Sequence, residues 1–339
     1  MVHRSGMIYP APVHPISAEV RVPTPILDLS LPRPDEQKKP RPSEKPAGRR
    51  GRNLDAVTAA AFLTPGMLAF ALFVILPAVG GLVLTFFQWD LFGTPKWVGL
   101  ANVSRLFGDA DMWHALGVTA LFVLMGVVPT ILIGFVLAVL VNTKMPGVGV
   151  VRVFYFAPMI ASAAVSALIW VNLYNSTGLV NQVLAWAGIS GPNWLSDLTW
   201  ARPALVVMMI WSGLPLVIIL YLAGLQRVSE DIYAAAALDG ASKWRQIWSM
   251  TWPNVWGTTL LIAVLETVGF VSGSFEVALI MTDGGPLGTT QSLALYAYKV
   301  AFSERDIGYA SALSLFQLVL MMAVVLLVRV IVRFRKERS

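Results

Sequence analysis

The sequence contains no cysteine, and its three histidines are scattered without the spacing of a metal site. A disulfide framework, a thiolate metal site and a cysteine nucleophile are therefore excluded. The sequence also lacks a Gly-Lys-Ser/Thr phosphate-binding loop, and no Ser/His/Asp set is evident. Because that loop is the usual cradle for nucleotide phosphates, we expect the chain not to hydrolyse ATP itself. These absences predict a non-catalytic protein with no metal site and no bound cofactor.

Charged residues are also scarce in this sequence. Only 13% of the 339 residues are charged and 56% are apolar, whereas soluble proteins carry about 25% charged residues. Lipid offers the backbone no hydrogen-bond partner and the sequence shows no barrel pattern, so each membrane-crossing stretch is expected to be helical. The sequence therefore predicts an all-α integral membrane protein with six transmembrane helices, each near the required length of about 20 apolar residues. These spans cover residues 56–87, 114–141, 151–174, 204–225, 257–281 and 309–332.

Lysine and arginine are concentrated on one side of these spans. Of 25 such residues, 20 lie in the tail up to residue 55, in the loops after the second and fourth spans, or at the C-terminal end. Cytoplasmic loops carry the excess of basic residues, so both termini are predicted to be cytoplasmic. The net charge of +6 is thus a topology signal, and no nucleic-acid partner is expected.

The first 55 residues differ in composition from the rest. They hold 10 of the 21 prolines and many charges, without a periodic apolar pattern. Such a segment cannot bury a core, and we expect a disordered, Pro-rich cytoplasmic tail ahead of a six-span domain at residues 56–335.

The loop between the fourth and fifth spans, residues 229–256, contains "DIYAAAALDGASKWRQIWSMTWP". It is too polar to cross a membrane, but its Ala-rich start favours a helix. Gly240 can adopt a left-handed backbone, and Asp239 before it can cap the next helix. Pro253 is expected to end the unit. The sequence therefore predicts two short helices joined at Gly240, with an exposed apolar face on the second formed by Trp244, Ile247, Trp248, Met250 and Thr251.

With its Ala-Ala pair, its Asp-Gly-Ala at 239–241 and its terminal Pro253, this loop resembles the EAA loop of binding-protein-dependent ABC importer permeases. In that family the loop is a coupling helix that docks in a groove of the ATPase subunit. Two positions depart from the pattern: Ala234 replaces a Glu, which removes one charged contact, and Trp252 replaces a Leu. The alternative is an amphipathic helix that only rests on lipid. The resemblance assigns ATPase coupling to Ala234, Ala235, Asp239, Gly240, Ala241, Ile247, Trp248, Met250 and Pro253.

A second resemblance follows the fifth span, in "LIMTDGGPLGTTQSLALYAYKVAFSERDIGYASALS". It is similar to the carbohydrate branch of the family, in which a Thr-x-Gly-Gly-Pro turn precedes a Gly-Tyr-Ala segment. Gly284, Gly285 and Pro286 are expected to make a tight outer turn, and residues 293–302 a short outer helix. These would be docking surfaces for a binding protein, although the turn alone is also compatible with a plain connector. The resemblance implies the ABC importer type I permease fold over residues 56–335.

Glu266 is the clearest ionisable residue within a span, and such residues are functional candidates because they are costly in lipid. On a helix it shares a stripe of small, polar and aromatic residues. Its carboxyl group can accept hydrogen bonds from hydroxyl groups, and we hypothesise that it contacts the substrate. The alternative is that Gly269 and Gly273 pack helix against helix while Glu266 bonds within the bundle. The expected substrate path comprises Thr259, Glu266, Gly269, Phe270 and Gly273, together with Trp211 and Ser212, because the family's path is lined by the spans that flank the loop.

The resemblance implies a permease subunit that forms half of an alternating-access pathway for a carbohydrate, either a di- or an oligosaccharide, in the plasma or inner membrane. Its partners would be a second, different permease, an ABC ATPase dimer that binds ATP and Mg, an extracytoplasmic binding protein, and membrane lipid. Two alternatives remain open. One is an importer of glycerol phosphate or a related polyol, and the other is a membrane anchor or sensor.

Overall fold

The computed structural model describes residues 49–142 and 158–336, and the chain divides into two units, residues 1–65 and 66–339. The first unit is described only from the start of helix α1 (Arg49–Phe70). Residues 49–55, which were expected to belong to the tail, are therefore helical. The rest of the expected tail lies outside the described residues.

Five helical segments of the described chain are long and apolar enough to cross a membrane. They agree with five of the six predicted spans to within a few residues. The predicted span at 151–174 lies partly outside the described residues, and its described part carries the 11-residue helix α6 (Ala163–Leu173). The five segments are Thr58–Leu84, Ala110–Asn142, Ala201–Leu225, Trp256–Met281 and Ile307–Val330.

The first of these segments continues from α1 through a π-helical turn, η1 (Ala71–Ile75), into α2 (Leu76–Leu84). A short antiparallel hairpin follows, formed by β1 (Phe87–Gln88) and β2 (Lys96–Trp97). Helix α3 (Ala101–Gly108) then leads toward the next long helix.

The centre of the second unit is formed by α4 (Ala110–Asn142), α8 (Ala201–Leu225) and α12 (Trp256–Met281). Helix α4 packs along α8, and α12 contacts both of them as well as α6 and α14 (Ile307–Lys336). Side chains such as Phe122, Leu205 and Phe270 are buried where these helices meet. Because the long helices are apolar on all sides, lipid or other protein must cover the faces that this packing leaves exposed.

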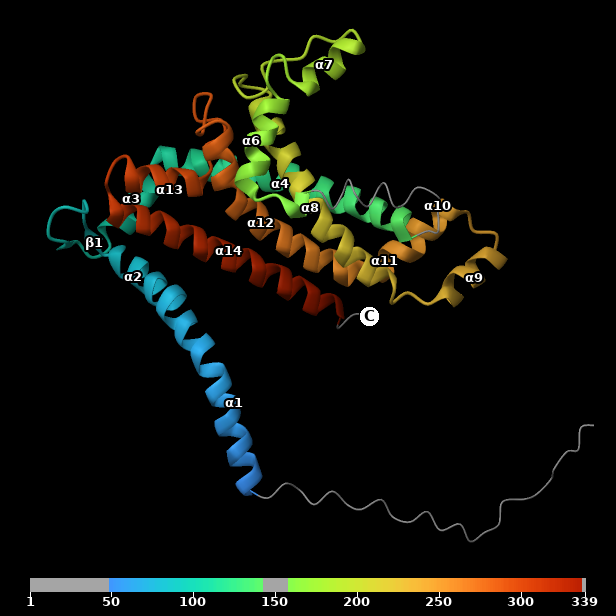
Figure 1. Ribbon diagram of the computed structural model, residues 1–339, viewed down its shortest axis with the longest axis horizontal. Coiled ribbons are helices and arrows are strands. Elements are labelled where there is room, and N and C mark those ends of the chain that lie inside the picture. Colours follow the sequence, from blue (N-terminus) through green and yellow to red (C-terminus); the bar gives the residue numbers. More distant parts are fainter. Residues whose placement is uncertain (1–48, 143–157, 337–339) are drawn as a thin grey trace, which may run out of the picture. The chain divides into compact units, whose positions relative to one another are not determined.

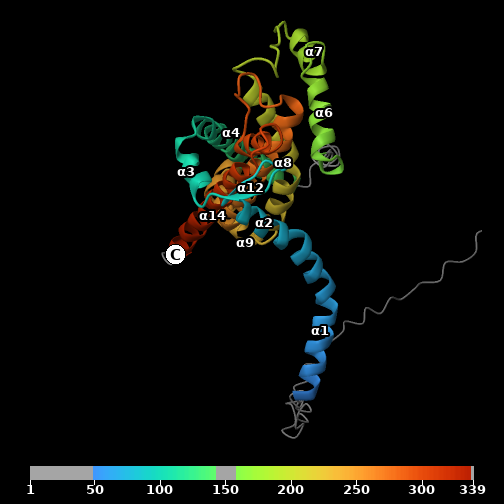
Figure 2. The ribbon, with the colours of Figure 1, turned by 90° about the vertical axis from the view of Figure 1, so that its left-hand side faces the viewer.

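Short elements mark the two ends of this bundle (Figure 1). At one end lie α9 (Glu230–Leu238), α10 (Lys243–Gln246), the π-helical η2 (Ile247–Thr251) and α11 (Trp252–Asn254). At the other end lie β1, α3 and α13 (Leu293–Phe302). Helix α13 confirms the short helix predicted at residues 293–302. Figure 2 shows α7 (Leu179–Trp186) beyond the end of α6, away from the long helices.

Candidate functional site

A cavity of about 210 Å³ lies among α6, α8 and α12, and it brings together five of the seven residues expected along a substrate path. These five are Ser212, Glu266, Gly269, Phe270 and Gly273. Sequence reasoning missed the other lining residues, because apolar and glycine positions of a span give no polar signal. The missed residues are Ala163, Met208, Met209, Gly213 and Val277.

Glu266 supplies the only carboxyl group among the described residues that line this cavity. The residue is 6% exposed, and Gly213 of α8 lies directly against its carboxyl oxygens. No described residue forms a hydrogen bond or an ion pair with this carboxyl group. The carboxyl oxygens are therefore available to accept hydrogen bonds from water or from a bound ligand.

The two glycines of the stripe leave space beside Glu266. A Cβ atom on Gly269 would meet no atom within 4 Å, and one on Gly273 would meet only the Met209 methyl group at 3.8 Å. Two helices that packed through these glycines would bring backbone atoms much closer. Gly269 and Gly273 therefore widen the cavity instead of joining two helices. Phe270 is also a lining residue, but it is only 2% exposed and its ring lies against helix α4.

The other two path candidates lie outside this cavity. Trp211 packs edge-on against Trp170 of α6, with ring centroids 5.7 Å apart. Thr259 accepts a hydrogen bond from the Tyr221 hydroxyl group at 3.1 Å and donates one to the Val255 carbonyl oxygen at 3.2 Å. Thr259 therefore links α8 to α12 about two turns from Glu266, on the side toward the elbow.

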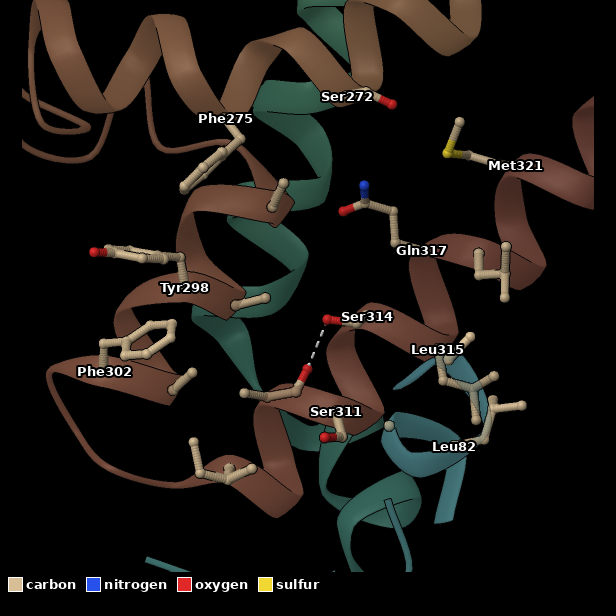
Figure 3. Close-up of a pocket in the computed structure, with 18 residues that line it drawn as sticks. Leu82, Ser272, Phe275, Tyr298, Phe302, Ser311, Ser314, Leu315, Gln317 and Met321 are labelled. Atoms are coloured by element: carbon tan, nitrogen blue, oxygen red, sulfur yellow. Dashed lines mark hydrogen bonds between the residues drawn. The ribbon is translucent and has the colours of Figure 1, made fainter. Parts of the chain in front are cut away.

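A larger cavity of about 710 Å³ is formed by α2, α12, α13 and α14, and it contains none of the expected path residues. Figure 3 shows Ser272, Ser311, Ser314 and Gln317 among its lining side chains. Ser314 donates its hydroxyl hydrogen to the Ala310 carbonyl oxygen of its own helix at 3.0 Å. The described lining has no carboxyl or basic group, so we place the candidate site at Glu266.

The elbow between α8 and α12 has the predicted joint at Gly240, where φ is +73°. The expected capping role of Asp239 was wrong, because Asp239 is the C-cap of α9. The next helix is instead capped by Ser242, whose hydroxyl oxygen accepts a hydrogen bond from the Arg245 amide at 3.3 Å. The expectation that Pro253 ends the unit holds to within one residue, because the helical unit ends at Asn254. Proline is tolerated in a first helical turn, and here α11 continues to Asn254 before α12 begins.

The structure also differs from the prediction in which side chains of the elbow are exposed. Ile247 and Trp248 pack against a buried cluster of α4, α8 and α12, and Thr251 is buried as well. Met250 is half-buried. The large apolar side chains that the elbow does expose are Leu238 at 90%, Trp244 at 69% and Ile232 at 37%. Ala234, Ala235 and Asp239 are exposed near them, and Ala241 is half-buried.

The Gly-Gly-Pro turn at the other end is held by its own hydroxyl groups. The Thr290 hydroxyl group donates to the Gly285 carbonyl oxygen at 2.7 Å and lies 2.7 Å from the Thr282 hydroxyl oxygen. Gly284 has φ +80°, and the Gly285–Pro286 bond is cis. The predicted tight turn is therefore present, with a defined internal structure.

A carboxylate beside this turn connects three elements. Asp109, just before α4, accepts hydrogen bonds from the hydroxyl groups of Tyr296 of α13, at 2.8 Å, and Tyr309 of α14. Burial opposes ionisation of Asp109, but these hydroxyl groups and the amides of Met112 and Asp111 outweigh it and lower the pKa of the carboxyl group. Asp109 thus ties the start of α4 to α13 and α14.

Several known proteins are similar to most of this chain. The family model described as "Binding-protein-dependent transport system inner membrane component" matches residues 132–337. The trehalose/maltose transport system permease protein MalF of Thermococcus litoralis is 31% identical over 277 residues, which cover 81% of this chain and 93% of that protein. The lactose transport system permease protein LacF of Rhizobium radiobacter is 29% identical over 269 residues, covering 78% and 89%.

The fold is also similar to a solved structure. A chain in the crystal structure of a bacterial ABC transporter involved in the import of the acidic polysaccharide alginate superimposes with a TM-score of 0.71. The match covers 83% of this chain and 98% of that one, at 23% sequence identity. At this identity the likeness concerns the fold alone.

Proposed function

The chain belongs to the carbohydrate-type family of binding-protein-dependent ABC transporter inner-membrane permeases, and we propose that it forms half of an import pathway for a neutral di- or oligosaccharide. Such a permease is a non-catalytic subunit of the inner membrane. ATP and Mg bind to the partner ATPase subunits, so this chain needs no cofactor of its own.

The observation that carries the carbohydrate proposal is the cavity at Glu266. A carboxyl group without a described partner can accept hydrogen bonds from sugar hydroxyl groups, and Met208, Met209 and Val277 give the same cavity an apolar lining. Such sites combine an apolar wall with a few convergent polar groups. Because Gly269 and Gly273 have no side chains, they leave room for the substrate beside Glu266.

The charge of the lining distinguishes between substrate classes. None of the described lining residues is basic, whereas recognition of a phosphate group normally uses Arg, Lys or a helix N-terminus. Glycerol phosphate is therefore the weaker candidate. MalF and LacF, whose names give trehalose, maltose and lactose, support a neutral disaccharide.

The same proposal includes the topology and the partners. We infer six spans, the third of which includes α6, with both termini in the cytoplasm and residues 1–55 as a cytoplasmic tail. A second, different permease would complete the pathway and cover apolar faces of this chain. An external binding protein would deliver the sugar to the end at which the Gly-Gly-Pro turn and α13 lie.

The elbow at residues 229–256 is proposed as the contact with the ATPase dimer. It lies at the end of the bundle opposite to α13 and exposes Leu238 and Trp244. Exposed apolar side chains of this size are typical of a protein interface. The missing Glu at position 234 removes one charge from this contact, and the apolar contacts remain.

The substitution Glu266→Gln tests the site in proteoliposomes that contain the complete transporter. It keeps the shape of the side chain but replaces one carboxyl oxygen with an amide nitrogen, which cannot accept a hydrogen bond from a sugar hydroxyl group, so the apparent affinity for the sugar is expected to fall by about tenfold. Glu304→Gln is the matched control, because Glu304 is exposed in the turn before α14. Unchanged affinity and rate in Glu266→Gln would refute the role of Glu266.

A further inference from the structure

Four tryptophans recur at every fourth residue from the elbow into the fifth span: Trp244, Trp248, Trp252 and Trp256. Their rings touch in sequence, with centroids 5.6, 5.7 and 6.4 Å apart and with tilted or edge-on geometry. Such geometries are the favourable ones for aromatic pairs. We call these four residues the tryptophan column. It starts at the exposed Trp244 and ends at the first residue of α12.

The π-helical η2 helps to keep the four tryptophan side chains on one side of the helix. In an α-helix, four residues advance about 40° beyond a full turn, so side chains at this spacing drift around the axis. The π-helical η2 contains more residues per turn, and it removes part of this drift. Its defining bond runs from the Trp252 amide to the Ile247 carbonyl oxygen, five residues earlier.

The middle of the column contacts the core of the bundle through Phe135 of α4, which is fully buried. The Phe135 ring lies 5.8 Å from Trp248, 4.7 Å from Trp252 and 5.4 Å from Tyr221 of α8. Tyr221 then donates its hydroxyl hydrogen to Thr259 of α12. The column therefore meets three long helices, of which α8 and α12 line the Glu266 cavity and α4 packs against both.

The elbow is joined to the column from the other side. The Tyr233 hydroxyl group of α9 is hydrogen-bonded to the Thr251 hydroxyl group of η2 at 3.1 Å. Thr251 also donates to the Gln246 carbonyl oxygen at 3.2 Å. The buried Trp248 Nε1 has no acceptor among the described residues, and a buried donor without a partner disfavours the arrangement that contains it. A displacement of α9 would thus reach the column through Thr251. A movement that brought Trp248 Nε1 to an acceptor would stabilise the displaced arrangement.

We propose that the tryptophan column transmits displacement of the elbow to α4, α8 and α12, and that Trp248 is a positioning residue that sets how much sugar is moved per ATP. Packed aromatic side chains change between discrete arrangements and do not deform continuously, so a column of them can pass on a displacement. This inference rests on the proposed function, because it requires an ATPase at the elbow and a substrate at Glu266.

The test is the number of sugar molecules imported per ATP hydrolysed by the reconstituted complex. For Trp248→Leu we expect this ratio to fall by about fivefold, the scale of effects reported for residues that couple sites. In Phe135→Leu, which changes the same contact from α4, retention of the ATPase subunit and hydrolysis without sugar should stay as in the wild type. Trp248→Phe keeps an aromatic ring and should restore most of the ratio. Trp186→Leu is the matched control, because Trp186 is an exposed tryptophan on α7.

A double-mutant cycle with Phe135→Leu tests the contact itself. Residues that act through one contact give effects that do not add, so the double variant should be hardly worse than either single variant. Should Trp248→Leu not assemble, Phe135→Leu carries the same expectation, because it leaves the column in place. Strictly additive effects, or a ratio in Trp248→Leu equal to that of Trp186→Leu, would overturn the proposal.

These outcomes separate the two claims. A wild-type complex that hydrolyses ATP but imports no carbohydrate refutes the proposed substrate, and the inference about the column falls with it. A wild-type complex that imports carbohydrate, together with an unchanged ratio in Trp248→Leu, refutes the column alone.

Discussion

The Oε2 atom of Glu266 on α12 lies 2.7 Å from the position that a Cβ atom would take on Gly213 of α8. Real Cβ atoms are essentially never found so close to another heavy atom. The carboxyl group can therefore occupy this position only because residue 213 of α8 has no side chain. The position of the carboxyl group within the cavity is therefore set by two helices.

This relationship predicts that Gly213→Ala displaces the Glu266 carboxyl group and weakens its bond to the sugar. The loss of a hydrogen bond is worth roughly 1 kcal/mol, so the apparent affinity in uptake assays should fall about fivefold. Gly257→Ala is the control, since a Cβ atom on this glycine of the same helix α12 would meet nothing within 4 Å. Equal uptake by both variants would contradict the placement of the substrate at Glu266.

A second prediction concerns the exposed surface of the elbow. Leu238 is 90% exposed at the end of α9, and docking of the ATPase subunit should bury it. Because burial of a leucine side chain contributes about 1.5–3 kcal/mol, Leu238→Ser should weaken ATPase binding by about tenfold or more. The measurement is the affinity of the isolated ATPase subunit for the permease pair in nanodiscs.

The matched control for this surface is Leu287→Ser. Leu287 is 87% exposed, but it lies in the turn at the opposite end of the bundle. The Leu287→Ser variant should bind the ATPase subunit with the affinity of the wild type. A Leu238→Ser variant with unchanged affinity would show that the ATPase docks elsewhere.

A third prediction concerns stability at the outer end. Asp109→Asn replaces the charged acceptor of the Tyr296 and Tyr309 hydroxyl groups, and it should reduce the free energy of unfolding by roughly 1–2 kcal/mol near neutral pH. The lowered pKa of Asp109 means that its contribution is complete above the usual value of 3.8 and is lost as the pH falls through the lower, folded-state pKa.

The difference in melting temperature between the wild type and Asp109→Asn should therefore be constant from about pH 5 upward and shrink only in stronger acid. Asp111→Asn is the control, because the Asp111 side chain is exposed beside the same helix start. A difference that disappears near pH 6 would contradict the assignment of the effect to Asp109.

The long helices were predictable from the sequence because a membrane span needs an unbroken apolar run, which is a local property. Gly240 was predictable for a similar reason, since few other residues adopt a positive φ. The inward turn of Ile247 and Trp248 was not, because which face of the elbow packs on α4, α8 and α12 is set by contacts between elements distant in the sequence. An ordinary helical pattern assigned them to an exposed face.

The cavity was predictable only in part. The sequence identified Glu266 from its cost in lipid, and the stripe around it followed from helical spacing. Which neighbours share the cavity depends on how α8 and α6 are rotated against α12, and no local pattern records that rotation. Thr259 therefore bonds Tyr221 instead of lining the cavity, and the lining residues Met209 and Gly213 gave no signal.

The most direct test of the central claim is ATP hydrolysis by the complete complex in nanodiscs, with its binding protein present, against mono-, di- and trisaccharides and glycerol phosphate. We expect one di- or oligosaccharide to stimulate hydrolysis, and Glu266→Gln to need more of it for the same stimulation. Stimulation by glycerol phosphate alone, or by no ligand while the ATPase remains bound, would contradict the assignment of this chain to neutral carbohydrate import.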